Sequence, residues 1–342
     1  MAVYNGADYL VPAIDSILQQ TYSHFEFIII NDGSTDDTTK ILQHYEQLDE
    51  RIKVYAQANQ GLPISLNRGI RLARGKYIAR MDADDISLPE RFAKQVEFME
   101  SHPEVGVCGT QIKMIGENSY VDAYPSSHPA IQCWLLLASG IAHPSVFLRY
   151  SFIELYQLYY DPEYTYCQDY ELWIRASNYC KLANIPEVLL FYRSHPEQMG
   201  QSYSENVRSL EYRFVWTKLC GCLQLQATEE RWYVHRLLWK FSFLQTRQFI
   251  TQVEAWLVAL LSANQHQHVY SESELERFIS DRWFIICDNT RSLGIWMAWK
   301  FRFSNLTHMS SLTRKEIREF CVDCIKRDIK KLLFYCGLRK SV

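Results

Sequence analysis

The sequence predicts an α/β layered domain followed by a helical module, and three observations lead to that prediction. Over the first hundred residues, strand-like segments alternate with helical patterns of about a dozen residues. Residues 109–200 are less regular and rich in Tyr, Pro and His. From about residue 205, long helical patterns with many tryptophans and few glycines follow. Because 342 residues exceed one small core, we expect two domains, at 1–204 and 205–342.

The elements of the first domain can be assigned in chain order. Segment 25–30 is aromatic and β-branched, which predicts a buried strand that stops at the turn Asn31-Asp32-Gly33-Ser34. The apolar residues Ile41, Leu42, Tyr45 and Leu48 then repeat at helical spacing and predict a helix, with Ser34 or Thr35 as its cap. The later elements are expected to be strands at 51–56, 76–81 and 105–108 and helices at 62–73, 92–99 and 169–176. This alternation implies parallel strands joined by crossover helices, with ligands at the carboxyl ends of the strands.

Acidic residues follow two of these strands. Asp32 comes after segment 25–30, and Asp82, Asp84 and Asp85 come after segment 76–81, so both acidic loops are expected on one rim. Carboxylates this close raise one another's pKa unless a cation lies among them, so the pattern is typical of a hard-cation site. The alternative is an acidic loop that caps the next helix, which Asp85 or Ser87 could do alone.

Composition excludes several classes of protein. Hydrophobic residues make up 48% and charged residues 22%, which is typical of a globular chain. The net charge of -3, from 36 basic and 39 acidic residues, gives no field that would attract nucleic acid. Ten scattered cysteines and an opening without a charged-then-apolar leader indicate a reducing, cytoplasmic compartment. Cys321-x-x-Cys324 lacks a second pair at zinc spacing, so we expect it to be structural.

Five motifs occur in a fixed order along the first 200 residues. They are Val3-Tyr4-Asn5-Gly6, Asn31-Asp32-Gly33-Ser34-Thr35-Asp36, Asp82-Ala83-Asp84-Asp85, Gln168-Asp169-Tyr170-Glu171-Leu172-Trp173 and Tyr192-Arg193-Ser194-His195. Together they resemble family 2 glycosyltransferases, and Leu66-Asn67-Arg68-Gly69 and His143-Pro144-Ser145-Val146 resemble the bacterial members that build surface polysaccharides. The resemblance implies the GT-A fold, a Rossmann-like mixed sheet flanked by helices, and sugar transfer with inversion.

The resemblance also implies roles for individual residues. Asp169 matches the catalytic base, which takes the proton of the acceptor hydroxyl in a single displacement. Asp84 matches the carboxylate that binds Mn²⁺ or Mg²⁺, and Asp82 matches its partner nearer the ribose. Asp32 matches the residue that accepts hydrogen bonds from the nucleotide base or ribose, although a turn or capping role stays open for it.

Four further residues are candidates for the site. His195 matches a histidine that approaches the metal or diphosphate, and Arg193 could pair with phosphate. Tyr4 could stack on the nucleotide base. His195 and Arg193 could also be ordinary loop residues, and His143 could either shape the acceptor side of the cleft or simply pack.

Three departures from the family pattern matter. Gln168 stands where the family commonly has glutamate, which changes the charge beside Asp169. Only Met1 and Ala2 precede Val3, so either the start lies upstream or the first strand is nearly absent and leaves a central sheet position unfilled. The Gln-x-x-Arg-Trp signature of processive synthases is missing, which favours transfer of a single sugar.

The tail from Arg314 to Lys340 is basic and amphipathic. It could lie on the inner membrane face beside a lipid-linked acceptor, or form the solvated face of a packed helix. No apolar stretch is long enough to cross a bilayer.

We therefore expect a cytoplasmic, metal-dependent glycosyltransferase that moves one sugar from a nucleotide-diphosphate sugar, first of all a UDP-sugar, to a glycan or lipid-linked acceptor. One alternative is a catalytically impaired scaffold of the same fold, suggested by the short amino end and Gln168. The other is a nucleotidyltransferase, which would need a Gly-rich basic loop after the first strand, whereas segment 4–8 has one glycine and no basic residue.

Overall fold

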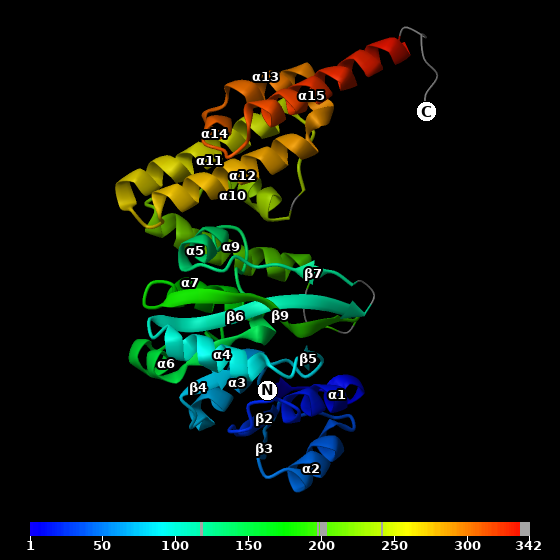
Figure 1. Cartoon of the computed structure of the whole chain (residues 1–342), viewed down its shortest axis with the longest axis vertical. Helices are drawn as coiled ribbons and strands as arrows, with labels where there is room; N and C mark the ends of the chain where they lie inside the picture. The colour runs from blue at the N-terminus through cyan, green and yellow to red at the C-terminus, as the bar shows by residue number, and fades with distance from the viewer. Residues whose placement is uncertain (117–118, 197, 199–203, 241, 336–342) are drawn as a thin grey trace. The chain divides into compact units, whose positions relative to one another are not determined.

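The computed structural model describes residues 1–116, 119–196, 198, 204–240 and 242–335 (Figure 1). The chain forms two compact units, residues 1–215 and 216–342. From the sequence we place the domain boundary between residues 204 and 205, and that placement stays a prediction.

The first unit begins with a small parallel sheet in the order β1-β2-β3. Its strands are β1 (Ala2–Val3), β2 (Phe27–Asn31) and β3 (Ile52–Ala56), with α1 (Ala7–Leu18) and α2 (Thr38–Leu48) as crossovers and α3 (Leu62–Leu72) after β3. β2 is buried or half-buried at every residue, as its β-branched and aromatic sequence predicts. The register pairs Phe27 with Ile52 and Ala2 with Ile30, so β1 meets only the last part of β2.

A second, mixed sheet has the order β4-β8-β6-β9-β5. Its strands are β4 (Tyr77–Ala79), β5 (Ile86–Ser87), β6 (Val105–Gly116), β8 (Phe147–Arg149) and β9 (Lys181–Ser194), and β7 (Val121–Asp122) pairs with β6. β6 and β9 run parallel, whereas the other pairs are antiparallel. The expectation of parallel pairing therefore holds for the first sheet alone, and the mixed sheet flanked by helices is confirmed.

The long strand β9 falls in the segment that the sequence describes as irregular. Pro186 interrupts its apolar pattern and lacks the N–H that a sheet ladder requires. The strand accommodates it with a bulge: Thr110 of β6 pairs with Ile185, and Gln111 pairs with Val188. Pro186 and Glu187 thus lie outside the ladder, which lets the strand continue to Ser194.

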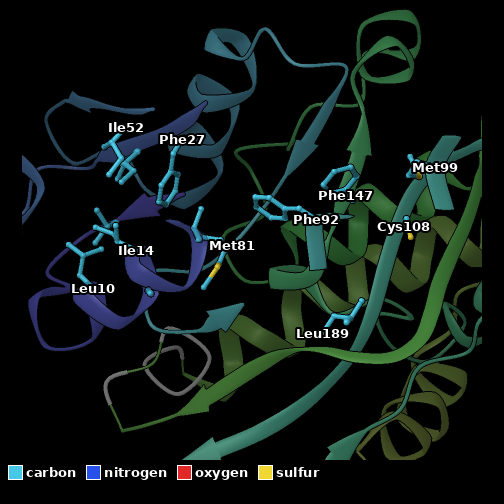
Figure 2. Close-up of a cluster of buried hydrophobic side chains, with 14 of the residues drawn as sticks. Leu10, Ile14, Phe27, Ile52, Met81, Phe92, Met99, Cys108, Phe147 and Leu189 are labelled. Carbon is cyan, nitrogen blue, oxygen red and sulfur yellow. The ribbon is translucent and has the colours of Figure 1, made fainter. Parts of the chain in front are cut away.

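Helices pack around these sheets over a shared core. They are α4 (Arg91–Ser101), α5 (His128–Trp134), η1 (His143–Ser145), α6 (Tyr150–Tyr156), α7 (Gln168–Ala176) and the start of α9 (Glu205–Cys222). One cluster of buried side chains joins Leu10 and Ile14 of α1 and Phe27 of β2 to Phe92 of α4 and Phe147 of β8 (Figure 2). This core orients the strand ends that carry the acidic loops.

The second unit is helical, as the sequence predicts. It contains α10 (Glu229–Trp239), α11 (Arg247–Gln267), α12 (Glu272–Asn289), η2 (Arg291–Leu293), α13 (Ile295–Phe303), α14 (Asn305–His308) and α15 (Arg314–Tyr335). Trp256, Trp283 and Phe301 are buried in it, which accounts for its tryptophan-rich pattern. Cys321 and Cys324 are free thiols on α15. Within the described chain, no helix is long and apolar enough to cross a bilayer.

Two of the predicted helix caps are wrong. α2 begins at Thr38, where Asp36 Oδ1 accepts the Thr38 N–H, so Ser34 and Thr35 do not cap it. α4 begins at Arg91 after Glu90, so neither Asp85 nor Ser87 is its cap.

Candidate active site

The carboxyl ends of β1, β2 and β4 meet at one cavity of about 870 Å³ in the first unit. Six of the residues that the sequence singles out line it, namely Tyr4, Asp32, Asp82, Asp84, Asp169 and His195. β1 and β2 are parallel neighbours whose carboxyl ends share one edge, whereas β4 of the second sheet ends at the same cavity from the other side of it. The cavity therefore brings together the acidic rim and the proposed base.

Tyr4 is presented to this cavity by a turn that the loop after β2 holds. Asn5 adopts a positive φ of 50°, and its Oδ1 accepts the Thr35 N–H at 2.8 Å while its own N–H donates to Ser34 Oγ at 3.0 Å. Gly33, in the same loop as Ser34, has a φ of 77°, and a Cβ there would lie 2.7 Å from the Asn59 nitrogen. Tyr4 stays 53% exposed, so its ring is available to a planar ligand.

Asp32 fixes the loop that leads into α3. Its Oδ1 accepts hydrogen bonds from Gln57 Nε2 at 2.7 Å and from the Gln60 N–H at 2.9 Å. Its Oδ2 accepts the Gly61 N–H at 2.9 Å. The carboxylate is thus buried and oriented by its neighbours, yet it still lines the cavity. A structural role and a ligand-binding role are compatible here, because Oδ2 accepts one hydrogen bond and can accept a second.

Asp82 is paired with a buried arginine that the sequence analysis does not single out. Arg80 Nη1 and Nη2 donate to the two oxygens of Asp82 at 2.6 and 2.5 Å. Burial raises the pKa of Asp82, Arg80 opposes that rise, and the nearby Asp84 adds to it. The bidentate pair fixes the carboxylate in one orientation on the rim.

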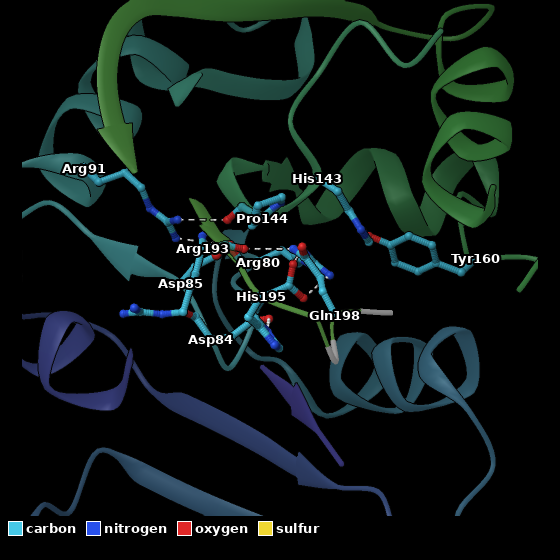
Figure 3. A network of polar contacts seen from close by, with 11 residues as sticks. Arg80, Asp84, Asp85, Arg91, His143, Pro144, Tyr160, Arg193, His195 and Gln198 are labelled. Carbon is cyan, nitrogen blue, oxygen red and sulfur yellow. Dashed lines mark hydrogen bonds and ion pairs between the residues drawn. The ribbon is translucent and has the colours of Figure 1, made fainter. Parts of the chain in front are cut away.

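Asp85 is fully buried beneath the same loop. Its Oδ1 accepts the Arg193 N–H at 2.9 Å, whereas its Oδ2 has no hydrogen-bond partner among the described residues (Figure 3). Burial, followed by repulsion from Asp82 and Asp84, raises its pKa well above the usual value. A buried carboxylate oxygen without a partner indicates a site built for a further positive group.

The three carboxylates fit a hard divalent cation. Asp82, Asp84 and Asp85 each offer an oxygen, and these oxygens lie within 4.8 Å of one another. Oxygen donors of this kind suit Mg²⁺ or Mn²⁺, which keep water or phosphate oxygens as their remaining ligands. The unpartnered Oδ2 of Asp85 and this donor set together satisfy the chemistry of such a site.

The end of β9 holds the acidic loop from the other side. His195 Nε2 donates to Asp84 Oδ2 at 3.0 Å, and Arg193 Nε donates to the Asp84 backbone oxygen at 2.9 Å (Figure 3). Tyr9 of α1 joins the two, with its ring 4.6 Å from that of His195 and 4.9 Å from the Arg193 guanidinium carbon. In this structure Arg193 and His195 therefore both orient Asp84.

Asp169 lies in the first turn of α7, two residues after the cap position at Cys167. Burial raises its pKa to about 6, against the lowering effects of the Tyr170 N–H and Arg80. A carboxylate with such a pKa is ionised at neutral pH and is a stronger base than an ordinary aspartate. Its environment thus suits proton abstraction.

Gln168 has a structural role that a glutamate could not fill in its ionised form. The side chain is buried, and its amide nitrogen donates to the backbone oxygens of Thr165 and Tyr166, each at 3.0 Å. A carboxylate there would place negative charge against two carbonyl oxygens. Gln168 therefore holds the loop before α7 and leaves Asp169 as the carboxylate that faces the cavity at this point of the chain.

The same loop is anchored by Glu211, which the sequence analysis does not single out. From α9, its carboxylate accepts the N–H groups of Thr165, Tyr166 and Cys167 at 3.0, 2.8 and 2.7 Å. Three backbone donors on one buried carboxylate form a strong, charge-assisted anchor. No local pattern marks Glu211, because the residues it binds lie more than forty positions away in the chain.

Arg91 and His143 support the rim from beneath. Arg91 is fully buried and donates to the backbone oxygens of Pro144 and Arg80, at 3.0 and 3.1 Å, and burial lowers its pKa to about 9. His143 Nε2 contacts the Tyr160 hydroxyl at 2.8 Å, and burial lowers the histidine's pKa well below its usual value (Figure 3). His143 lines the cavity and also packs against Tyr160, whereas its place on the acceptor side stays a prediction.

Comparisons with known proteins agree with this geometry. The model of the family described as Glycosyl transferase family 2 matches residues 1–154. The O-antigen biosynthesis glycosyltransferase WbnJ of Escherichia coli is 38% identical over 209 residues, 59% of this chain and 81% of that protein. An uncharacterized glycosyltransferase of Haemophilus influenzae is 34% identical over 216 residues, 60% of this chain and 67% of that protein.

The fold is also found among solved structures. The crystal structure of S. aureus TarS 1-349 in complex with UDP-GlcNAc matches with a TM-score of 0.57 and 16% identity, over 98% of this chain and 90% of that one. At this identity the likeness concerns the fold, and the fold is the one that the sequence predicts.

Proposed function

Because the chain belongs to glycosyl transferase family 2 and is a glycosyltransferase, we propose that it transfers a single sugar, with inversion, from a nucleotide-diphosphate sugar to a glycan or lipid-linked acceptor. The observation that carries this proposal is the convergence of Asp169 with Asp82 and Asp84 on one cavity. A scaffold would have no need of a base beside a cation site, so this convergence favours an active enzyme.

We propose a UDP-sugar as the first donor to test. The nucleotide would meet Tyr4 and Asp32 at the ends of β1 and β2, where an exposed ring can stack and a fixed carboxylate can accept from N–H and O–H donors. The structural neighbour TarS binds UDP-GlcNAc in its solved complex, which makes that sugar nucleotide a reasonable starting compound.

The proposed metal ligands are Asp84 and His195, with the carboxylates of Asp82 and Asp85 beside them. A bound Mn²⁺ or Mg²⁺ would supply positive charge that stabilises the departing diphosphate. Arg80 fixes Asp82, and Arg193 contributes a guanidinium group near the same loop, where it could also meet phosphate.

Asp169 is the proposed base. Its carboxylate accepts the proton of the acceptor hydroxyl as that oxygen attacks the sugar carbon opposite the leaving diphosphate. Inversion needs one such carboxylate and no covalent intermediate. With a pKa of about 6, Asp169 is ready for this role at neutral pH.

We further propose surface-polysaccharide synthesis as the pathway and the cytoplasm, at the inner membrane face, as the location. WbnJ, by its name, works in O-antigen biosynthesis, and another relative is named as a teichuronic acid biosynthesis glycosyltransferase. On α15, Val322, Ile325, Ile329 and Leu332 are exposed at helical spacing among basic residues. That face suits an anionic leaflet, while Arg339 and Lys340 of the predicted tail lie outside the described residues.

Calorimetric titration of UDP, GDP and dTDP, each with and without Mn²⁺, tests the proposal. Metal-dependent binding of one nucleotide, followed by release of the nucleoside diphosphate from the matching sugar nucleotide, is the expected result. Absence of binding to all three would favour the scaffold, and release of pyrophosphate from a nucleoside triphosphate and a sugar phosphate would favour a nucleotidyltransferase. Sedimentation with anionic vesicles, compared between the native chain and Ile329→Glu, tests the membrane contact.

A further inference from the structure

One wall of the active-site cavity is formed by the short strand β7, which pairs with β6 (Figure 1). Side chains of alternate residues point to the same face of a strand. Along β7 and the residues beside it, Tyr120, Asp122 and Tyr124 line the cavity, and Val121 between them belongs to the other face. One short segment thus presents two aromatic rings and a carboxylate to the cavity.

The carboxylate of Asp122 is oriented by its own segment. The Tyr124 hydroxyl donates to Asp122 Oδ2 at 2.9 Å. Gln111 of β6 holds Tyr124 in turn, because its Nε2 donates to the Tyr124 backbone oxygen at 2.9 Å and its Oε1 accepts the Tyr124 N–H at 2.5 Å. The other oxygen of Asp122 can therefore accept a hydrogen bond from a ligand hydroxyl in a fixed direction.

This wall lies near the proposed base. Tyr124 packs, together with Tyr192 of β9, on a buried cluster of Ile112, Ala142 and Leu190. Burial, followed by the charge and the hydrogen bond of Asp122, raises the pKa of Tyr124 well above its usual value, and Tyr192 and Asp169 add to the rise. Asp122 and Asp169 thus act on the same ring. An acceptor whose hydroxyl reaches Asp169 therefore meets the β7 wall as well.

The charges that line the cavity are mostly negative. Among the described residues, the carboxylates of the lining are those of Asp8, Asp32, Asp82, Asp84, Asp122 and Asp169, and the basic side chains are those of Arg80, His143 and His195. Arg80 donates to both oxygens of Asp82, and His195 is paired with Asp84. Burial lowers the pKa of His143 well below its usual value, so this ring is neutral at neutral pH. The described lining therefore leaves no positive side chain for an anionic acceptor.

We propose that β7 selects the acceptor by charge: it takes an uncharged sugar residue, which stacks on Tyr120 or Tyr124 and donates a hydroxyl to Asp122, and it rejects a uronate. This selection rests on the sugar transfer proposed above, whose acceptor class it specifies. Aromatic rings bind the C–H faces of sugars, and a carboxylate accepts from their hydroxyls. A uronate would bring a like charge close to Asp122 and Asp169 in a partly buried cavity, where such repulsion is strong.

A dication at the acidic rim would not reverse this selection, because the diphosphate of the donor matches its charge. Asp122 is thus the specificity-determining residue for the acceptor, whereas Asp169 is needed for the transfer itself.

The experiment uses two pairs of p-nitrophenyl glycosides, each pair differing only in a hydroxymethyl group or a carboxylate on the sugar. These are the β-D-glucoside with the β-D-glucuronide, and the β-D-galactoside with the β-D-galacturonide. Binding is titrated by saturation-transfer NMR, with and without UDP and Mg²⁺. We expect the native chain to bind the neutral member of a pair about tenfold more tightly than its uronate, and Asp122→Asn to remove most of that difference.

Two further variants separate charge selection from a change in the fold. Tyr124→Phe loses the hydroxyl that orients Asp122, so we expect it to bind neutral glycosides about two- to tenfold more weakly. Val121→Thr alters the other face of the same segment and should keep the native ratio of affinities. Circular dichroism and urea unfolding check that each variant is folded.

Three results would overturn the selection. They are uronates that bind as tightly as their neutral partners, an Asp122→Asn ratio equal to the native one, and binding of none of the four glycosides by a chain that binds UDP. Failure to bind UDP with Mg²⁺ would instead count against the proposed function, and the glycoside titrations without UDP then decide on the subsite by the same ratios.

Discussion

Replacing Asp169 by asparagine should abolish transfer and make the fold more stable at neutral pH. The side chain keeps its shape and loses its charge. Burial raises the pKa of Asp169 from 3.8 to about 6, and one pKa unit corresponds to 1.36 kcal/mol, so the ionised carboxylate costs the fold at most about 3 kcal/mol. Loss of the base should lower kcat by about 10²–10⁴-fold.

The sign of the pH dependence follows from the direction of that shift. The folded-state pKa lies above the unfolded value, so the contribution of Asp169 to stability is complete below pH 3.8 and is lost as the pH rises through about 6. Asp169→Asn does not undergo this loss. The difference in free energy of unfolding between variant and native protein should therefore grow from pH 4 to pH 7 and then level off.

Urea unfolding followed by tryptophan fluorescence, at half-unit steps between pH 4.5 and pH 7.5, measures this difference. Asp8→Asn is the matched control, because Asp8 lines the same cavity but is exposed. An Asp169→Asn difference that is flat across this range, or that shrinks as the pH rises, would contradict the raised pKa of Asp169.

Two more predictions concern the loop before α7. Gln168→Glu should lower the free energy of unfolding by about 1–3 kcal/mol at pH 7.5, because a carboxylate cannot donate to the oxygens of Thr165 and Tyr166. Native-like stability in urea unfolding would show that these two hydrogen bonds do not stabilise the fold. Glu211→Gln should lower the free energy of unfolding by about 1–3 kcal/mol in the same assay, because it removes a charged acceptor of three backbone N–H groups. Glu163→Gln is the control and should leave the free energy of unfolding nearly unchanged, because Glu163 is exposed. Equal losses in these two variants would contradict the anchoring role.

The sequence predicts those parts of the site that depend on strand order. Asp32 follows the buried strand β2, and the carboxyl end of a parallel strand is where a ligand site is expected. Asp82 and Asp84 follow β4, which pairs antiparallel with β8 in the mixed sheet, so their convergence with Asp32 depends on how the two sheets pack. Asp169 could be placed with them only through the resemblance, because α7 reaches the rim by a path that no local pattern specifies.

The supporting residues could not be predicted, for a physical reason. Arg80 and Arg91 are unremarkable in a list of basic residues, and their importance comes from burial, which tertiary packing alone determines. Glu211 binds backbone groups of a distant loop, and such contacts leave no periodic signal. The strand β9 could not be predicted because Pro186 interrupts its apolar pattern. The bulge that places this proline outside the ladder depends on pairing with β6.

The most direct test of the account is calorimetry of UDP with Mn²⁺ on the native protein, Asp84→Asn and Asp169→Asn. The proposed roles predict that Asp84→Asn abolishes metal-dependent binding, whereas Asp169→Asn binds like the native protein and fails only in transfer. Equal loss of binding in both variants, or native binding by Asp84→Asn, would contradict the division of labour between the acidic rim and the base.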